Sequence, residues 1–172
     1  ERQPRVGARA GDALFVTGTL GGAALGLRLL EGGNSGPAVM LQRFLRPIPR
    51  IAEGRRLVGL ATAAIDISDG LLRDLGHLCQ ASGVGAEVDV DALPLQPGLA
   101  EGARALGLDA CELALTGGED YELLFTAPAH ALPRVAATRI GSIVAGSAIR
   151  LRDAAGRTLP MPASLGHSHF GQ

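Results

Sequence analysis

Apolar residues recur along this chain with two spacings, one typical of strands and one typical of helices. Short alternating or continuous apolar runs predict strands at residues 13–17, 63–67, 86–90, 121–126, 140–145 and 149–152. Apolar residues spaced by one helical turn predict helices at residues 23–30, 39–45, 51–60, 99–106 and 110–115. Because strands and helices are interspersed, the pattern predicts a mixed β-sheet flanked by helices, in the α/β or α+β class.

The middle of the chain shows both spacings in succession. Alternation places Ile65 and Ile67 on one face of a strand, and Asp66 and Ser68 on the other. The next residues predict a helix that ends at the glycine-rich residues 82–85. Its apolar stripe consists of Leu71, Leu72, Leu75, Leu78 and Cys79. Ser68 or Asp69 is the expected N-cap of this helix. The polar residues are therefore predicted to lie where a strand gives way to a helix.

The composition indicates a folded protein. Of the 172 residues, 47% are hydrophobic and 19% are charged, which is enough apolar chain to bury a core. No apolar run approaches the roughly 18–20 residues of a membrane-spanning helix, so no membrane partner is expected. Residues 1–5 lack the apolar core of a secretion signal, and we expect a cytoplasmic protein. Cys79 and Cys111 match no metal or redox spacing, and Cys79 is expected to be a small buried apolar residue.

The charges narrow the range of partners. All sixteen basic residues are Arg, which excludes the P-loop motif because that motif requires a Lys. Residues 1–56 hold nine Arg against four acids, whereas residues 57–172 hold seven Arg against thirteen acids. A basic segment facing an acidic one suits a metal–polyphosphate site, and solvated surfaces explain it almost as well. With 3% aromatic residues and a net charge of −1, the chain is not expected to bind nucleic acid.

The first candidate site is the run Asp66-Ile67-Ser68-Asp69-Gly70. Its carboxylates would converge beside the N–H groups of a helix start, where a cation and a phosphate can be held together. Oxygen ligands suit hard cations such as Mg²⁺, and Mg²⁺ usually accompanies phosphates. The alternative is ordinary capping of the helix by Ser68 and Asp69, with Asp66 in solvent.

The second candidate site is the run Gly117-Gly118-Glu119-Asp120-Tyr121-Glu122. The paired glycines permit unusual backbone angles and the close approach of a ligand to Glu119. The alternative is a plain loop that leads into a strand whose Tyr121, Leu123 and Phe125 pack inward. The residues alone favour neither interpretation.

Two further patterns are weaker. Residues 18–22, Gly-Thr-Leu-Gly-Gly, follow a strand and open a helix, as a phosphate-binding loop would. They lack the G-x-G-x-x-G dinucleotide pattern, and a plain turn is the preferred interpretation. His167 and His169 could chelate a metal, although an unstructured tail is the simpler explanation.

Together these segments resemble the C-terminal half of the thiamine-monophosphate kinases, a family of the aminoimidazole-ribonucleotide-synthetase-like superfamily. Residues 66–71 and 117–125 carry the most specific part of the resemblance. Other matching segments extend it over nearly the whole chain: residues 5–8, 11–12, 17–21, 45–50, 74–78, 82–86 and 169–170. The resemblance implies the fold of the superfamily's C-terminal domain.

The resemblance also implies an activity. The family transfers the γ-phosphoryl group of ATP to thiamine monophosphate and makes thiamine diphosphate, with several Mg²⁺ ions. By resemblance, Asp66 and Asp69 would be Mg²⁺ ligands, Arg5 and Ser68 would contact ATP, and Glu119 would contact the thiamine substrate. Phosphoryl transfer needs alignment and charge neutralisation more than covalent chemistry, so no covalent nucleophile is expected.

The chain departs from the family pattern at two points. The family usually has an aromatic residue that contacts the substrate's ring at the position of His167, which places His167 in the substrate site by resemblance. The family's N-terminal domain, which carries most acidic metal ligands and forms the dimer, has no counterpart here. Residues 1–11 would be the linker from that domain, and residues 12–172 the substrate- and metal-binding domain with an irregular tail at 160–172. We therefore expect an incomplete enzyme whose full-length form is a homodimer.

Two other functions fit these residues. One is a different ATP-dependent enzyme of the same superfamily that acts on another phosphate-activated substrate. The other is a non-catalytic interaction module that has kept the fold. The presence of Asp66, Ser68, Asp69 and Glu119 argues against such a module, because a module freed from catalysis need not keep costly clustered acids.

Overall fold

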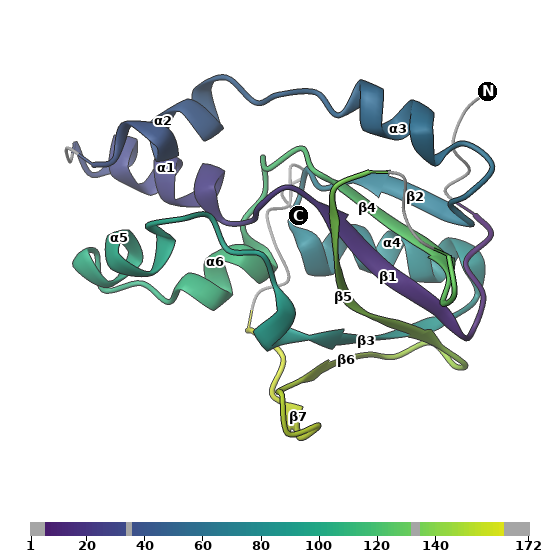
Figure 1. Ribbon diagram of the computed structural model, residues 1–172. Helices are drawn as coiled ribbons and strands as arrows, with labels where there is room; N and C mark the ends of the chain where they lie inside the picture. Colours follow the sequence, from purple (N-terminus) through teal and green to yellow (C-terminus); the bar gives the residue numbers. More distant parts are fainter. Residues whose placement is uncertain (1–5, 34–35, 132–134, 164–172) are drawn as a thin grey trace, which may run out of the picture.

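One seven-stranded sheet forms the centre of the computed structural model, which describes residues 6–33, 36–131 and 135–163 (Figure 1). Its strands are β1 (Asp12–Thr17), β2 (Ala63–Asp66), β3 (Gly85–Asp89), β4 (Leu123–Pro128), β5 (Ala137–Val144), β6 (Ile149–Arg152) and β7 (Thr158–Leu159). The order is β2-β4-β1-β5-β3-β6-β7. Neighbours are antiparallel except β3 and β6, which are parallel. The sheet is therefore mixed, which confirms the predicted class.

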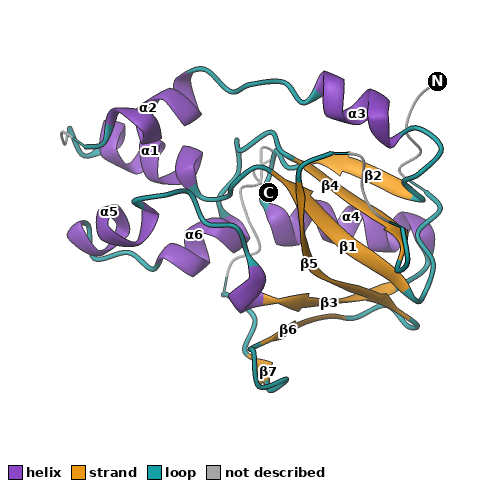
Figure 2. Cartoon of the chain, in the orientation of Figure 1, coloured by secondary structure: helices purple, strands orange, loops and turns teal. Residues whose placement is uncertain are grey.

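The helices are α1 (Gly22–Glu31), α2 (Ala38–Leu45), α3 (Ile51–Leu57), α4 (Leu71–Ser82), α5 (Leu99–Ala105) and α6 (Ala110–Thr116), with a 3-10 turn at Val90–Ala92. One helix, α4, covers one face of the sheet, α1, α2, α5 and α6 gather at one end of it, and α3 lies apart from both (Figure 2). In Figure 1, α4 lies behind the sheet, and α1, α2, α5 and α6 lie together beside it. Among the described residues, none of these helices combines the length and apolar character needed to cross a bilayer.

The core is built by alternation along the central strand, β1. Leu14 and Val16 face the apolar cluster that includes the stripe of α4, whereas Phe15 belongs to a second cluster on the opposite face. There Phe15 stacks on Phe125 with ring centroids 5.2 Å apart. Cys79 is buried in the α4 cluster, as predicted, and burial raises the pKa of its thiol to about 11. Every residue of β1 is buried, as expected for a strand covered on both faces.

A third apolar cluster joins the helices that gather at the end of the sheet. Its largest buried members are Leu25, Leu29, Met40, Leu99 and Leu113. At Gly26 a Cβ atom would collide with the carbonyl of Met40, so this glycine lets α1 and α2 pack closely. The close contact fixes the position of α2 relative to α1.

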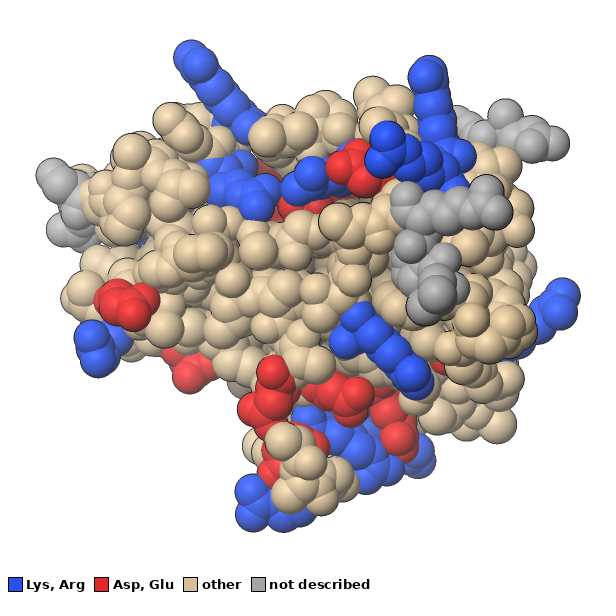
Figure 3. All heavy atoms as spheres, in the orientation of Figure 1, with Lys and Arg blue, Asp and Glu red and all other residues tan. Residues whose placement is uncertain are grey.

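Basic side chains gather along the segment that contains α2 and α3, at the top of the molecule in Figure 3. This segment holds Arg43, Arg46, Arg50, Arg55 and Arg56, in agreement with the basic first third of the sequence. Acidic atoms lie between them in the same view. Arg43 and Arg50 of this segment form ion pairs with Glu122, which directly precedes β4.

Candidate functional site

The two acidic motifs, far apart in sequence, lie against each other in the fold. We call residues 66–70 the first acidic loop and residues 117–122 the second acidic loop. The backbone N–H of Glu119 donates to the carbonyl of Ser68, and that of Tyr121 donates to the carbonyl of Ile67, both at 2.9 Å. They meet because β2 and β4 are neighbours, with Asp66 paired to Leu123 at the end of the ladder. Strand pairing thus brings both candidate sites to one place.

The second acidic loop has an unusual backbone. In the described part of the chain, Glu119 (φ 67°) and Tyr121 (φ 50°) are the non-glycine residues with left-handed angles. Such angles cost about 1–3 kcal/mol each and persist where the surroundings enforce them. The bonds to the first acidic loop provide that enforcement. At Gly118 a Cβ atom would collide with the carbonyl of Ser68, so the contact between the loops requires this glycine.

The left-handed angles correct one expectation from the sequence. The strand begins at Leu123 instead of residue 121, and Tyr121 does not pack inward with Leu123 and Phe125. The Tyr121 hydroxyl instead donates to Oε2 of Glu119 at 3.2 Å. The alternation that predicted an inward-facing Tyr121 fails because the backbone is not extended at this residue.

The helix after the first acidic loop is also capped differently from the prediction. The N-cap of α4 is Gly70, without a side-chain cap, so the assignment of Ser68 or Asp69 was wrong. Instead Asp74, inside the first turn of α4, accepts the backbone N–H groups of Ser68 (2.9 Å) and Asp69 (3.0 Å). Asp74 is buried, and burial raises the pKa of its carboxyl. Its side chain holds the first acidic loop in shape.

A hollow of about 440 Å³ opens beside the first acidic loop. Asp66, Ser68 and Asp69 line it, as the sequence suggested, together with Asp74 and His77. The candidate ligand atoms of Asp69, Asp74 and His77 all lie within 4.8 Å of one another, and Asp66 is exposed in the same hollow. Asp74 and His77 were not singled out from the sequence, although their spacing of one helical turn on α4 could have suggested them.

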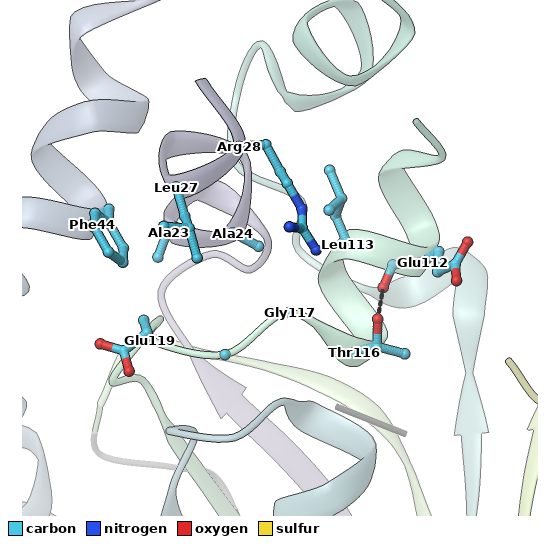
Figure 4. Close-up of a pocket in the computed structure, with 11 residues that line it drawn as sticks. Ala23, Ala24, Leu27, Arg28, Phe44, Glu112, Leu113, Thr116, Gly117 and Glu119 are labelled. Atoms are coloured by element: carbon cyan, nitrogen blue, oxygen red, sulfur yellow. Dashed lines mark hydrogen bonds between the residues drawn. The ribbon is translucent and has the colours of Figure 1, made fainter. Parts of the chain in front are cut away.

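A second, smaller hollow contains Glu119 and has a volume of about 170 Å³ (Figure 4). It lies between α1, α2, α6 and the second acidic loop. Phe44 and Glu119 lie at one end of it in this view, and Glu112 and Thr116 lie at the other. The remaining walls are mostly apolar or backbone: Ala23, Ala24, Leu27, Arg28, Leu113, Gly117 and Gly118. Because Glu119 is bonded to Ser68, this hollow adjoins the first acidic loop.

Asp120 joins the second acidic loop to the start of α1. Its carboxylate accepts the N–H groups of Gly21 (2.9 Å) and Ala23 (3.3 Å). Burial raises the pKa of Asp120 to about 7. Two amides at the start of α1 that a phosphate could use, those of Gly21 and Ala23, are therefore occupied by a carboxylate of the protein. This arrangement supports the interpretation of residues 18–22 as a plain turn.

Glu122, the last residue of the second acidic loop, is the centre of a buried ion-pair cluster that the sequence did not reveal. Its carboxylate accepts the hydroxyl of Thr17 (2.7 Å), two guanidinium nitrogens of Arg50 (both 2.6 Å) and one of Arg43 (3.2 Å). Glu122 in turn raises the pKa of Arg50. The second acidic loop is thus anchored on both sides of Tyr121.

Arg5, His167 and His169 lie outside the described residues. The assignments of Arg5 to ATP and of His167 to the substrate stay predictions. The structure places Asp66, Ser68 and Asp69 at one hollow and Glu119 at the adjoining one, while their roles toward metal, ATP and substrate also stay predictions.

The sequence of this chain is similar to those of known proteins. Residues 9–154 match the family described as AIR synthase related protein, C-terminal domain. The chain is 48% identical over 129 residues to the thiamine-monophosphate kinase of Salmonella typhimurium, covering 72% of this chain and 39% of the relative. It is 42% identical over 150 residues to the thiamine-monophosphate kinase of Aquifex aeolicus, covering 84% and 49%.

A solved structure of AaThiL complexed with AMPPCP and TMP superposes with a TM-score of 0.84 at 38% identity. The match covers 98% of this chain and 55% of that one. The chain therefore spans about half the length, or less, of the relatives it matches.

Proposed function

Since the chain belongs to the family of AIR synthase related proteins, C-terminal domain, we propose that it is the C-terminal part of a thiamine-monophosphate kinase. The protein that carries it would transfer the γ-phosphoryl group of ATP to thiamine monophosphate and so make thiamine diphosphate. Curated relatives that are 42% and 48% identical to this chain have that name.

One observation carries the proposal. The 2.9 Å hydrogen bond from the Glu119 N–H to the Ser68 carbonyl joins the hollow with the candidate metal ligands to the hollow with the candidate substrate carboxylate. Phosphoryl transfer depends on holding the phosphoryl donor, the acceptor and the cation in fixed positions relative to one another. Two bonded loops on neighbouring strands supply a rigid frame for that alignment.

The first hollow fits Mg²⁺ by the chemistry of its donors. Asp66 and Asp69 offer carboxylate oxygens and Ser68 offers a hydroxyl, which are ligands that a hard cation accepts. In the proposal Asp66 and Asp69 hold Mg²⁺, and Ser68 and Arg5 contact ATP. When bound, Mg²⁺ neutralises negative charge on the transferring phosphate. Asp74 keeps the loop in its binding shape through its bonds to two backbone amides.

The second hollow fits the organic part of the substrate. Thiamine monophosphate carries a positively charged thiazolium ring, which the carboxylate of Glu119 would attract. In the proposal His167 contributes a further contact to the same ligand. AaThiL has been solved with AMPPCP and TMP bound, and this chain superposes on it over 98% of its length.

The proposal includes partners. An N-terminal domain would complete the active site and form a homodimer, and the enzyme would act in the cytoplasm. The chain's coverage of 39% to 49% of its curated relatives is consistent with such a second domain.

A kinase assay on the protein that carries this chain tests the proposal. Wild-type protein should phosphorylate thiamine monophosphate with ATP and Mg²⁺. Asp66→Asn and Asp69→Asn should each lower kcat/KM by at least about 100-fold, since each removes a charged metal ligand. Glu119→Gln should raise KM for thiamine monophosphate and leave KM for ATP unchanged.

Glu101→Gln, an exposed acid on α5, is the matched control and should behave as wild type. Wild-type protein that transfers no phosphate to thiamine monophosphate would overturn the proposed function. Full activity in Asp66→Asn would remove that residue from the metal site.

Titration calorimetry of the 172-residue chain with thiamine monophosphate then tests whether this domain binds the substrate by itself. Binding of thiamine monophosphate that is lost in Glu119→Gln would place recognition in this domain alone. A folded chain that does not bind would show that the site needs a further part of the protein.

A further inference from the structure

Phe44 occupies a position unlike those of the other described aromatic residues. Phe15 and Phe125 stack on each other in the core, and Tyr121 is hydrogen-bonded to Glu119. Phe44 is only half-buried and lines the hollow that contains Glu119 (Figure 4). An aromatic side chain that the core does not use, at a hollow with a carboxylate, is available to a ligand.

The surroundings hold Phe44 in this position before any ligand arrives. At Gly26 an added Cβ would lie 3.2 Å from Cβ of Phe44, so α1 passes directly beside it. The preceding residue, Arg43, is bonded to Thr19 (2.7 Å), Gln96 (3.0 Å) and Glu122 (3.2 Å). This anchoring fixes the backbone at Phe44 beside the hollow, so ordering of α2 adds no entropy cost to binding.

The size of the hollow suits one ring. Its volume of about 170 Å³ is below the range of about 300–1,000 Å³ for sites that enclose a whole drug-sized molecule. The side walls next to Phe44 are apolar, formed by Ala23, Ala24 and Leu27. A flat heterocycle can fill such a space while the rest of its molecule extends outward.

The charges at the hollow favour a cation. Glu119 contributes a carboxylate at the Phe44 end, whereas the Glu112 carboxylate points away from the hollow in Figure 4, and Arg28 is the basic residue among those that line it. Arg28 is paired with Glu31 at 2.9 Å, which offsets its charge. An aromatic face beside a carboxylate attracts a planar cation through both the ring quadrupole and the opposite charge.

We propose that Phe44 determines the specificity of this site by holding a planar, positively charged heterocycle against its ring face, with Glu119 as the counter-charge. The inference rests on the proposed function, in which that heterocycle is the thiazolium ring of thiamine monophosphate. It adds a second ring contact, from α2, to the one that the family resemblance assigns to position 167.

The test compares Phe44→Leu, Phe44→Tyr and the control Leu45→Ala in the protein that carries this chain. Leu45 is the next residue of α2, is 61% exposed and does not line the hollow. Phe44→Leu keeps an apolar side chain and removes the ring, so KM for thiamine monophosphate should rise about 10-fold. KM for ATP and the melting temperature should stay close to wild type. Phe44→Tyr should restore most of the affinity, and Leu45→Ala should not change it.

A second probe separates the ring's charge from its shape. The phosphate ester of 4-methyl-5-(2-hydroxyethyl)thiazole carries an uncharged ring, and Phe44→Leu should change its dissociation constant by less than about 2-fold. An equal loss for the charged and uncharged rings would overturn the role of Phe44 in recognising a cation. So would a wild-type KM for thiamine monophosphate in Phe44→Leu.

The outcomes also distinguish this inference from the proposed function. If wild-type protein binds thiamine monophosphate and Glu119→Gln weakens it while Phe44→Leu does not, the inference alone fails. If wild-type protein neither binds nor phosphorylates thiamine monophosphate, the proposed function fails and the inference fails with it.

Discussion

Arg50 donates two hydrogen bonds to Glu122, from Nε and Nη2, each 2.6 Å from a different carboxylate oxygen. The Glu122 side chain is 1% exposed and that of Arg50 is 19% exposed, so the carboxylate is shielded from water. Arg50 directly precedes α3, and Glu122 directly precedes β4. The pair therefore ties the helical segment that carries Phe44 to the second acidic loop that carries Glu119.

Loss of this pair should destabilise the protein. Arg50→Ala leaves the buried carboxylate with a smaller set of partners, and breaking a buried pair in this way costs about 3–5 kcal/mol. Because Arg43 and Thr17 still contact Glu122, we expect the lower end of that range. Urea denaturation should show a corresponding fall in the free energy of unfolding.

The control for this prediction is Arg28→Ala, which removes the ion pair with Glu31. Both side chains of that pair are about half exposed (45% and 54%), and exposed pairs contribute about 0–1 kcal/mol. Equal losses of stability in Arg28→Ala and Arg50→Ala would contradict the structural importance of the buried pair.

Asp120 should make the protein less stable as the pH rises from about 4 to about 7. Burial raises the pKa of this carboxyl from 3.8 to about 7, so the folded chain keeps a proton that the unfolded chain releases. The stabilising contribution is complete below the unfolded pKa and is lost as the pH rises through the folded pKa. At about 1.4 kcal/mol per pKa unit, the loss is on the order of 4 kcal/mol.

The variant Asp120→Asn isolates this effect because it keeps an acceptor for Gly21 and cannot ionise. The free energy of unfolding should be measured for both proteins at several pH values between 4 and 7. As the pH rises, the free energy of unfolding of the wild-type protein should fall relative to that of the variant. Parallel curves would show that Asp120 does not titrate in this window.

Gly118→Ala should weaken both the fold and the candidate site. The added Cβ would meet the backbone carbonyl of Ser68, which cannot move aside without separating the two acidic loops. Overpacking of this kind costs about 1–3 kcal/mol. In the kinase assay the same variant should lose activity, since the hydrogen bond between Glu119 and Ser68 depends on the close approach.

Gly76→Ala provides the matched control for that substitution. Gly76 lies inside α4, and an added Cβ meets nothing within 4 Å. Alanine is favoured over glycine in helices by about 1 kcal/mol, so thermal unfolding should shift upward in this variant. A destabilised Gly76→Ala, or a stable Gly118→Ala, would contradict the description of these two sites.

Local patterns in the sequence determined where most helices and strands lie and which face of each is buried. Alternation placed Ile65 and Ile67 inward and Asp66 outward, and the helical stripe from Leu71 to Cys79 packs against the sheet as expected. These predictions succeed because burial of apolar surface decides which side of a strand or helix faces the core. The same reasoning identified both acidic loops as candidate sites from their residues alone.

The tertiary structure decided how those residues meet. Pairing of β2 with β4 brings Ser68 to Glu119, and the resulting contact forces left-handed angles that no periodicity encodes. The partnerships of Arg50 with Glu122, and of Phe44 with the Glu119 hollow, join residues separated by more than seventy positions. Such contacts depend on strand register and on helix packing across the whole chain, and local propensity carries no information about either.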